Sequence, residues 1–440
     1  MKKISLLILI TGIGVAALQA QERGIYDLPY CLQTGVERNL DIHISRNNAQ
    51  IAKNNATKAA AGMTPTVDLN TSYDVAMESS RTKLRGGDAN RVTNSINRIF
   101  DASVDLGWTL FDGYGMQCTL QRLRELQKQG ELQTRQDAEQ LMADITTEYY
   151  NVLQQELRLR NYQYAVSLSR ERMRIAEARY LVGKGSRLDF QQASVDFNAD
   201  SSLYLKQREL ISTSRIRLNQ MMNVENIAQT FQIKDTLINL NSGLDYEELR
   251  QHMMAYSPTL LLAASAERVS QADLRKTKSS HYPYLRLKTG YGYSQRAYSK
   301  GGTRNNSGWG PDIGVTVGFN LFDKNKAREE RNARISLENA QLARQSALRD
   351  LEADLLDLWQ AYQNNLKVVN LEQENLKVAE SNYSIAHERF LLGQLSGIEM
   401  REAQKSLLDA SERLLAARYT TKVCEISLMH IAGKIKEYLS

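Results

Sequence analysis

Apolar side chains recur at intervals of seven residues through two long stretches of the chain. The first series ends at Tyr180 and the second at Phe390, and the two series correspond position for position at a separation of 210 residues. In the second stretch, Leu351 and Leu358 complete an alternating three-and-four spacing. This pattern is typical of helices that pack as coiled coils. Two such series in register indicate a duplicated fold.

A glycine interrupts each series at the same step, and a second heptad series follows it. The two glycines are Gly183 and Gly393. The sequence therefore predicts a helical hairpin in each half of the chain. The first hairpin is predicted at about 113–222 with its tip at 183–188, and the second at about 324–432 with its tip at 393–398. A continuous helix from Gly113 to Val182 would be on the order of 100 Å long.

Upstream of each long helix, two runs alternate apolar residues with small or polar residues, which is the period of a β-strand. The predicted strands are about 65–76 and 100–111 in the first half, and about 283–294 and 312–322 in the second. Polar, glycine-containing loops at 78–98 and 295–310 join them, and helical segments at about 39–62 and 258–280 precede them. Each half is predicted to run helix, strand, strand, long helix, glycine turn, helix.

The predicted organisation is a signal peptide at 1–20, a first repeat at 21–222, a linking segment at 223–243 and a second repeat at 244–440. Lys2 and Lys3 precede an apolar run from Ile4 to Leu18, and Gln19-Ala20 follows it. This is the pattern of a signal peptide cleaved after Ala20, because the run is too short for a membrane anchor. Export is therefore expected.

Composition supports a chain dominated by long helices. Only 5 of the 440 residues are proline, and the stretches 112–257 and 312–440 contain none. Proline breaks helices, so its absence favours long ones. A mean hydropathy of -0.46 argues against a bundle of transmembrane helices. The cysteines, Cys31, Cys118 and Cys424, are odd in number and widely spaced, which indicates no disulfide framework.

Charge and motif content argue against nucleic-acid binding and catalysis. Lys and Arg number 56 and Asp and Glu 50; removal of the two leader lysines leaves 54 minus 50, or +4. So small an excess does not predict a nucleic-acid partner. The five histidines are isolated, and the chain has no phosphate-binding glycine loop and no nucleophile elbow. We therefore expect no enzymatic activity, no cofactor and no metal site.

The four predicted strands have the length and alternation of membrane-spanning strands in a barrel. Aromatic residues that could form interfacial girdles accompany them: Trp108, Tyr282, Tyr284, Tyr291, Tyr293 and Trp309. Four strands cannot close a barrel, and open strand edges are not tolerated in lipid, so a spanning sheet requires oligomerisation. The alternative is a soluble sheet with one solvent-exposed face. The chain would then be a structural coiled-coil protein of the periplasm that forms no channel.

Taken together, the duplication, the Leu110-Phe-Asp112 and Leu321-Phe-Asp323 segments and the two glycine-turned tips resemble the TolC-like outer-membrane efflux protein family. The resemblance covers nearly the whole mature chain. It implies a mainly α fold with a β-barrel part: a homotrimer with a twelve-stranded outer-membrane β-barrel that continues into a periplasmic α-helical barrel. It also implies a periplasmic adaptor and an inner-membrane transporter as partners. The expected function is the exit duct of a tripartite efflux pump or a type I secretion system.

The same resemblance implies a periplasmic aperture lined by Phe390, Glu399 and Glu402. Glu399 and Glu402 are spaced i, i+3, so they share a helix face. Three copies would place six carboxylates around a narrow pore and favour cations. An ordinary solvated helix face is the alternative for the acids. Phe390 lacks the hydroxyl that the family pattern has at this position, so a hydrophobic constriction is the alternative to a polar latch.

Adaptor contact is expected at the two hairpin tips, whose glycines also serve as ordinary turn residues. Bulky substitutions at Gly183 or Gly393 are predicted to abolish transport while trimers still reach the outer membrane. The predicted contact residues are Gly183, Lys184, Gly185, Ser186, Arg187 and Leu188 in the first tip, and Gly393, Gln394, Leu395, Ser396, Gly397 and Ile398 in the second.

Overall fold

A computed structural model describes residues 24–83, 87 and 89–439 of the chain. The predicted signal peptide at 1–20 lies outside this part. The chain divides into two compact units. The first consists of the described residues of Met1–Arg46, Gln133–Leu261 and Ala347–Ser440, and the second of those of Asn47–Leu132 and Leu262–Ser346. The fold is mainly α with a β part, as predicted.

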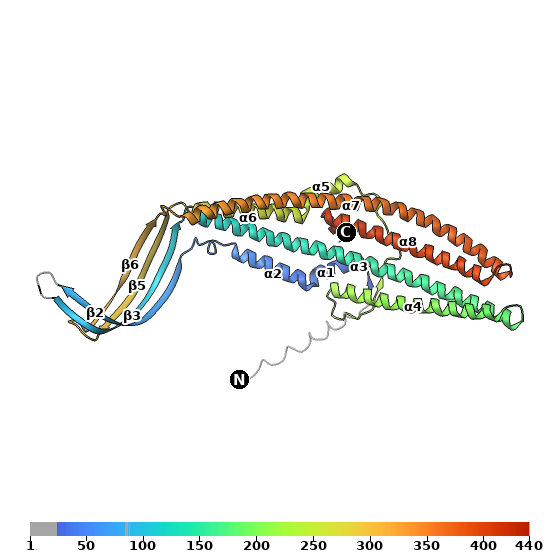
Figure 1. Ribbon diagram of the computed structural model, residues 1–440, viewed down its shortest axis with the longest axis horizontal. Helices are drawn as coiled ribbons and strands as arrows, with labels where there is room; N and C mark the ends of the chain where they lie inside the picture. Colours follow the sequence, from blue (N-terminus) through green and yellow to red (C-terminus); the bar gives the residue numbers. More distant parts are fainter. Residues whose placement is uncertain (1–23, 84–86, 88, 440) are drawn as a thin grey trace, which may run out of the picture. The chain divides into compact units, whose positions relative to one another are not determined.

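The second unit contains an antiparallel sheet of four strands in the order β2-β3-β5-β6 (Figure 1). The strands are β2 (Thr66–Lys83), β3 (Ala89–Phe111), β5 (Tyr284–Tyr298) and β6 (Asn305–Gly318). The predicted boundaries are wrong where a strand continues into a predicted polar loop, because backbone pairing does not require apolar side chains. The register slips once in that extension, between Glu78 and Ser80.

The predicted end of β6 is also wrong, and pairing explains the difference. β3 continues to Phe111 because β5 lies beside it, with Phe111 opposite Leu285. β6 stops at Gly318, opposite Tyr284, because β5 begins there and is the only described strand that pairs with β6. Phe322, which follows in sequence, is 79% exposed. The local pattern is the same in the two repeats, but the neighbouring strands differ.

The two faces of the sheet have opposite character. On one face, apolar side chains project from all four strands, and many are largely exposed, including Leu69, Tyr291, Trp309, Ile313 and Val317. The other face is polar and rich in glycine. A Cβ added at Gly290 would lie 2.8 Å from Asp105 Oδ1 and 2.9 Å from Asp312 Oδ1, so glycine leaves room for both carboxylates.

Four helices contribute residues to both units: α2 (Leu40–Asn55), α3 (Gly115–Leu181), α6 (Pro258–Ser279) and α7 (Lys324–Leu391). In the second unit, ion pairs join α3 to α6. Arg122 on α3 lies 2.8 Å from Asp273 on α6, and Arg268 on α6 lies 2.8 Å from Glu125 on α3. The α2 helix ends at Asn55, short of the predicted 62.

The first unit contains the two helical hairpins. In Figure 1, α4 (Arg187–Met221) runs back along α3, and α8 (Gly397–Ile431) runs back along α7. α4 and α8 begin and end 210 residues apart, the interval read from the sequence. The unit also contains α1 (Leu28–Arg38), α5 (Tyr246–Tyr256), a 3-10 helix (Ile435–Leu439), and the parallel pair β1 (Ile25–Tyr26) and β4 (Gln232–Ile233). Helices α1 and α5 were not predicted from the sequence.

A buried polar network ties the C-terminal segment into this unit. The Lys422 ammonium donates to Glu425 Oε1 at 2.7 Å, and the Tyr438 hydroxyl donates to the same oxygen at 2.7 Å. The backbone N–H of Asn241, in the linking segment, donates to Glu425 Oε2 at 3.0 Å. A buried carboxylate needs such partners, because loss of hydration is otherwise uncompensated. The network therefore fixes both segments against α8.

Replacing Tyr438 with phenylalanine is expected to lower stability by about 1–3 kcal/mol, because Glu425 loses a hydrogen bond to a charged acceptor. Thermal unfolding of the purified protein would measure the loss. Tyr256→Phe, at an exposed tyrosine of the same unit, is the control. Equal melting temperatures for the Tyr438 variant and the unaltered protein would contradict the role assigned to this network.

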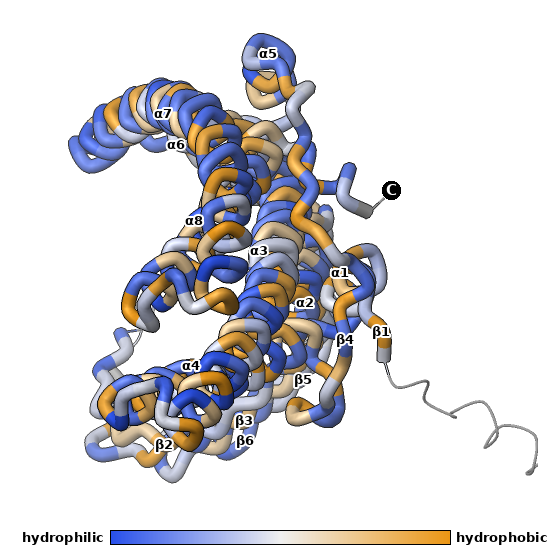
Figure 2. The backbone as a smooth tube through the Cα atoms, turned by 90° about the vertical axis from the view of Figure 1, so that its right-hand side faces the viewer, coloured by the Kyte–Doolittle hydropathy of each residue, from blue (hydrophilic) through white to orange (hydrophobic). Residues whose placement is uncertain are grey.

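Hydrophobic and hydrophilic segments alternate along the long helices, as the colouring of α7 in Figure 2 shows. In the part of the chain that the structure describes, every helix lacks the long and nearly uncharged apolar stretch that a membrane-crossing helix requires.

Candidate functional site

The two hairpin tips of the first unit have the same backbone geometry. Gly183 and Gly393 adopt φ values of 72° and 77°, in the left-handed region. The next residue in each turn closes the helix end: Lys184 N–H donates to the Arg179 carbonyl at 2.8 Å, and Gln394 N–H to the Arg389 carbonyl at 2.9 Å. Glycine at this position avoids the steric cost that a Cβ imposes at positive φ. The turn chemistry is therefore duplicated.

A capping box begins the returning helix at each tip. Ser396 Oγ accepts the Glu399 N–H at 3.2 Å, and the Glu399 carboxylate accepts the Ser396 N–H at 3.0 Å. Ser186 and Asp189 form the equivalent box at the start of α4. Hydrogen bonds from Ser396, the backbone N–H first, hold the pKa of Glu399 below its usual value. Glu399 thus has a structural task at the N-terminus of α8.

Replacing Ser396 with alanine is expected to weaken the start of α8 by about 0.5–2 kcal/mol, because the helix loses its N-cap acceptor. Hydrogen exchange of the amides in the first turn of α8 would show the loss as faster exchange. Ser406→Ala, at an exposed position of the same helix, is the matched control. Unchanged exchange in the Ser396 variant would contradict the capping role.

Large apolar side chains are exposed around both turns. Exposure is 75% for Leu181 and 70% for Leu188 at the first tip, and 73% for Leu392 and 76% for Ile398 at the second. Apolar groups gathered in this way on a surface mark a site of protein contact. Leu181 lies two residues before Gly183 and Leu392 one residue before Gly393, and both were absent from the predicted contact set.

Phe390 lies inside the first unit and not on its surface. Its ring is 4% exposed and packs with Ala386, Met400 and Ala403. Arg179, from the end of α3, places its guanidinium 4.7 Å from the ring centroid and donates to the Phe390 carbonyl at 2.6 Å. A cation at a helix C-terminus interacts favourably with the helix dipole. In this arrangement, Phe390 joins the two tips within one chain.

An arginine and aspartate cluster joins three helices behind the tips. Arg401 on α8 contacts Asp200 on α4 through two hydrogen bonds of 2.8 and 2.9 Å. One turn earlier on α4, Asp196 accepts from Arg172 on α3 at 2.5 Å. Asp200 is 3% exposed and Arg172 4%. Bidentate pairs of this kind are strong and directional. We call these four residues the tip cluster.

Burial and pairing shift the pKa values of the two arginines of the tip cluster in opposite directions. Burial lowers the pKa of Arg172, which Asp196 partly offsets. The hydrogen bonds to Asp200 raise the pKa of Arg401. Both guanidiniums remain charged because arginine titrates above pH 12. Arg172 and Arg401 are therefore charged throughout the physiological pH range.

The three predicted aperture residues fall into three different settings. Phe390 is buried, Glu399 is committed to the capping box, and Glu402 is exposed. Among the described residues, no hydrogen-bond or ion-pair partner is recorded for Glu402. Of the two acids, Glu402 is therefore the one that takes no part in the capping box.

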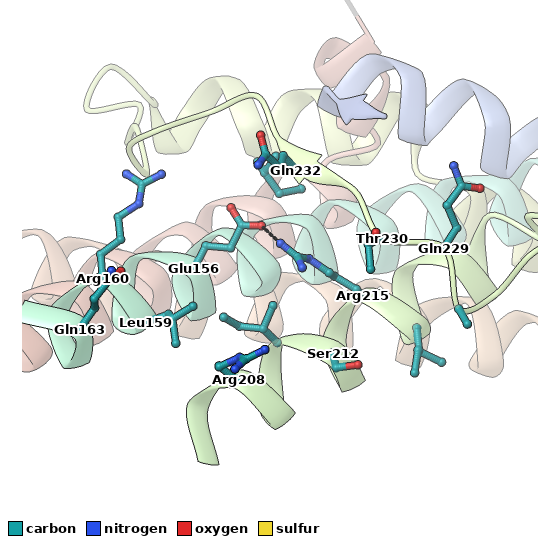
Figure 3. Close-up of a pocket in the computed structure, with 14 residues that line it drawn as sticks. Glu156, Leu159, Arg160, Gln163, Arg208, Ser212, Arg215, Gln229, Thr230 and Gln232 are labelled. Carbon is teal, nitrogen blue, oxygen red and sulfur yellow. Dashed lines mark hydrogen bonds and ion pairs between the residues drawn. The ribbon is translucent and has the colours of Figure 1, made fainter. Parts of the chain in front are cut away.

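A groove of about 510 Å³ lies between α3, α4 and the linking segment, and was not predicted (Figure 3). Arg215 on α4 donates to Glu156 on α3 at 2.7 Å inside it. Arg160 and Arg208 also line the groove, and among the described residues neither has an ion-pair partner. The lining is therefore net positive and would favour an anionic group.

The sequence contained no signal for the tip cluster. Its members lie on charge-rich helices, and none has a counterpart of the same type 210 residues away in the other repeat. The chemistry available at the tips is contact and ion pairing. The described residues contain no group of three or more His, Cys, Asp or Glu side chains that could hold a metal ion.

Comparison with known proteins identifies the family of the chain. The model of the family described as "Outer membrane efflux protein" matches residues 32–224 and 249–434. The outer membrane protein TolC of Salmonella enteritidis is 20% identical over 187 residues, which are 41% of this chain and 38% of TolC. The matched region thus spans well under half of that relative.

Solved structures share the fold over 92% of the chain. They include a membrane protein from Pseudomonas aeruginosa (TM-score 0.77, 13% identity, 90% of that chain covered) and the CmeC outer membrane channel of Campylobacter jejuni (0.76, 15%, 85%). The outer membrane protein VceC of Vibrio cholerae is similar as well (0.74, 16%, 96%). Because the family model matches both repeats, the chain belongs to the outer membrane efflux protein family and is located in the outer membrane.

Proposed function

We propose that the chain forms the exit duct of a tripartite efflux pump or type I secretion system. Substrates would pass from an inner-membrane transporter and a periplasmic adaptor through the duct to the outside. The duct performs no chemistry and needs no cofactor. The proposal rests on family membership and on the two surfaces described above, the apolar sheet face and the exposed tips.

The observation that carries the proposal is the sheet of the second unit. Its apolar face is exposed on all four strands, and such a face is unfavourable in water. Its outer strands, β2 and β6, each have one unpaired edge in the described chain. Unpaired backbone groups cost several kcal/mol each in lipid, so a spanning sheet has to close on itself. Three copies would supply twelve strands and bring β2 of one copy beside β6 of the next.

The tips support the partner assignment. The exposed leucines and isoleucine around the two glycine turns form an apolar surface that a soluble helical hairpin would not keep uncovered. A periplasmic adaptor is the partner that this surface fits. The predicted contact residues at both tips remain part of this proposal, and Leu181 and Leu392 extend it.

The alternative of a non-channel structural coiled coil makes a different prediction about the sheet. If the strands merely cap the helices, the protein stays in the soluble periplasmic fraction. If they span the membrane, cell fractionation should recover it in the outer membrane as a species of three times the chain mass. That species should dissociate to single chains on heating before electrophoresis. Soluble single chains in the periplasmic fraction would contradict the proposal.

A further inference from the structure

The hairpin end of the sheet in the second unit is strongly basic. Here β2 and β3 continue past β5 and β6, and the described residues of 76–83, 89–98 and 295–306 include seven Lys or Arg and one acid, Glu78. Glu78 already accepts from the Asn97 amide at 3.0 Å. The positive charge at this end is therefore not neutralised within the described chain.

Two of these arginines lie directly opposite each other. Arg81 on β2 pairs in register with Arg91 on β3. Like charges at directly opposite positions of an antiparallel pair repel and are destabilising. Among the described residues, neither arginine has an ion-pair partner. An external anion that binds both guanidiniums would offset this repulsion.

Arg98 lies on the apolar face, at the edge of the aromatic rows. It lies two residues before Phe100, on the same face of β3, and is paired with Val75 on β2 and Ala297 on β5. From Trp108 to Arg98 is ten residues, or about 33 Å along the strand. For a strand tilted by about 40°, this is about 25 Å along the membrane normal, the height of the apolar band of a membrane barrel. Arg98 thus falls at the level where lipid headgroups begin.

The β5–β6 loop brings further cations to the same end. Lys300 donates to the carbonyl of Thr93 at 3.1 Å, two residues from Arg91. The Arg304 carbonyl accepts from Tyr298 N–H at 3.0 Å, and Tyr298 pairs with Asn97 beside Arg98. We call Arg81, Arg91, Arg98, Lys300 and Arg304 the cationic rim.

The height of the rim identifies the class of ligand. Arg91 lies seven residues beyond Arg98, or about 23 Å further along the strand. The headgroup layer of an ordinary phospholipid is only about 5–8 Å deep. Cations spread over a greater height match a headgroup whose phosphates sit on sugars well above the acyl chains. Arginine suits phosphate because its fork donates two parallel hydrogen bonds.

We propose that the cationic rim binds the phosphate groups of a phosphorylated glycolipid in the membrane leaflet next to the hairpins. The proposal rests on the spanning sheet of the proposed function. The proposal does not depend on the hairpin tips, because all rim residues lie in the second unit and the tips lie in the first. Binding would neutralise the Arg81 and Arg91 pair and anchor the hairpin end at the membrane surface.

The test uses the full-length protein in phosphatidylcholine vesicles with fluorescent lipopolysaccharide as the probe. Arg81→Gln, Arg91→Gln and Arg98→Gln combined are expected to weaken probe binding at least about tenfold, because anionic-lipid binding scales with the number of nearby cations. The control combines Arg174→Gln, Arg331→Gln and Arg349→Gln, three exposed arginines of α3 and α7, and should bind as the unaltered protein does.

Two outcomes would overturn the inference: equal binding by the rim variant and the control, or equally effective competition by phosphatidylglycerol, whose headgroup is short. Both variants should still conduct in phosphatidylcholine bilayers. If the unaltered protein conducts but shows no preference for lipopolysaccharide, the rim proposal fails and the duct stands. If the unaltered protein binds the probe but does not conduct, the duct fails.

Discussion

Replacing Gly393 with valine should abolish efflux while trimers still reach the outer membrane. Residue 393 has a φ of 77°, a conformation in which a β-branched residue is a genuine outlier. The left-handed region costs an ordinary residue about 1–2 kcal/mol, and the turn would shift to avoid it. No atom lies within 4 Å of a Cβ built at this position, so crowding inside the chain is not the cause. Gly183 has the same properties, and the same result is expected there.

The measurement is the sensitivity of a deletion strain to toxic compounds when it carries each variant. The Gly393 variant is expected to resemble the empty strain, with tolerated concentrations reduced at least about tenfold, since a misplaced docking surface removes most contact energy. Ser406→Val is the matched control, because it introduces the same side chain at an exposed position of α8 outside the predicted contact residues. Unchanged resistance in the Gly393 variant would contradict the account.

Replacing Arg401 with alanine should loosen the second hairpin from α4. The change leaves the Asp200 carboxylate, 3% exposed, without its bidentate partner. Removing one member of a buried pair costs about 3–5 kcal/mol. We expect the lower end of that range because the Arg401 side chain itself is 26% exposed. Faster hydrogen exchange of amides near the start of α8, and a larger resting conductance, would register the effect.

Two further variants separate pairing from other causes. Arg401→Lys keeps the charge but loses the fork geometry, so an intermediate effect is expected. The double variant Arg401→Ala with Asp200→Ala removes both charges and should recover part of the stability lost in the single variant. If the single and double variants are equally destabilised, the pair does not carry the contact between α4 and α8.

The elements that could be predicted are those fixed by local chemistry. The glycine turns, the start of α6 at Pro258 and the seven-residue periodicity depend on residues close in sequence, and the structure has them where the pattern indicates. Strand ends were harder, because β6 stops at Gly318, where its partner β5 begins at Tyr284, although the apolar pattern continues beyond it. The alternation of apolar and polar residues along one strand does not show which distant strand pairs with it.

The candidate site was predictable in place but not in detail. The turns indicated where a partner would dock, since glycine and exposed apolar residues occur together there. The burial of Phe390 under Arg179, and the pairing of Arg401 with Asp200, depend on which helix faces which. Charged residues are abundant on all four long helices, so their spacing alone does not select partners. The three-dimensional packing of the two hairpins makes that selection.

Reconstitution of the purified full-length protein in planar bilayers tests the central claim most directly. A duct closed by several copies of the four-stranded sheet should produce discrete conductance steps, with a preference for cations that falls when Glu402 is replaced with glutamine. A protein that reaches the bilayer and yields no conductance steps, under conditions in which it is trimeric, would contradict the claim that this chain forms a channel.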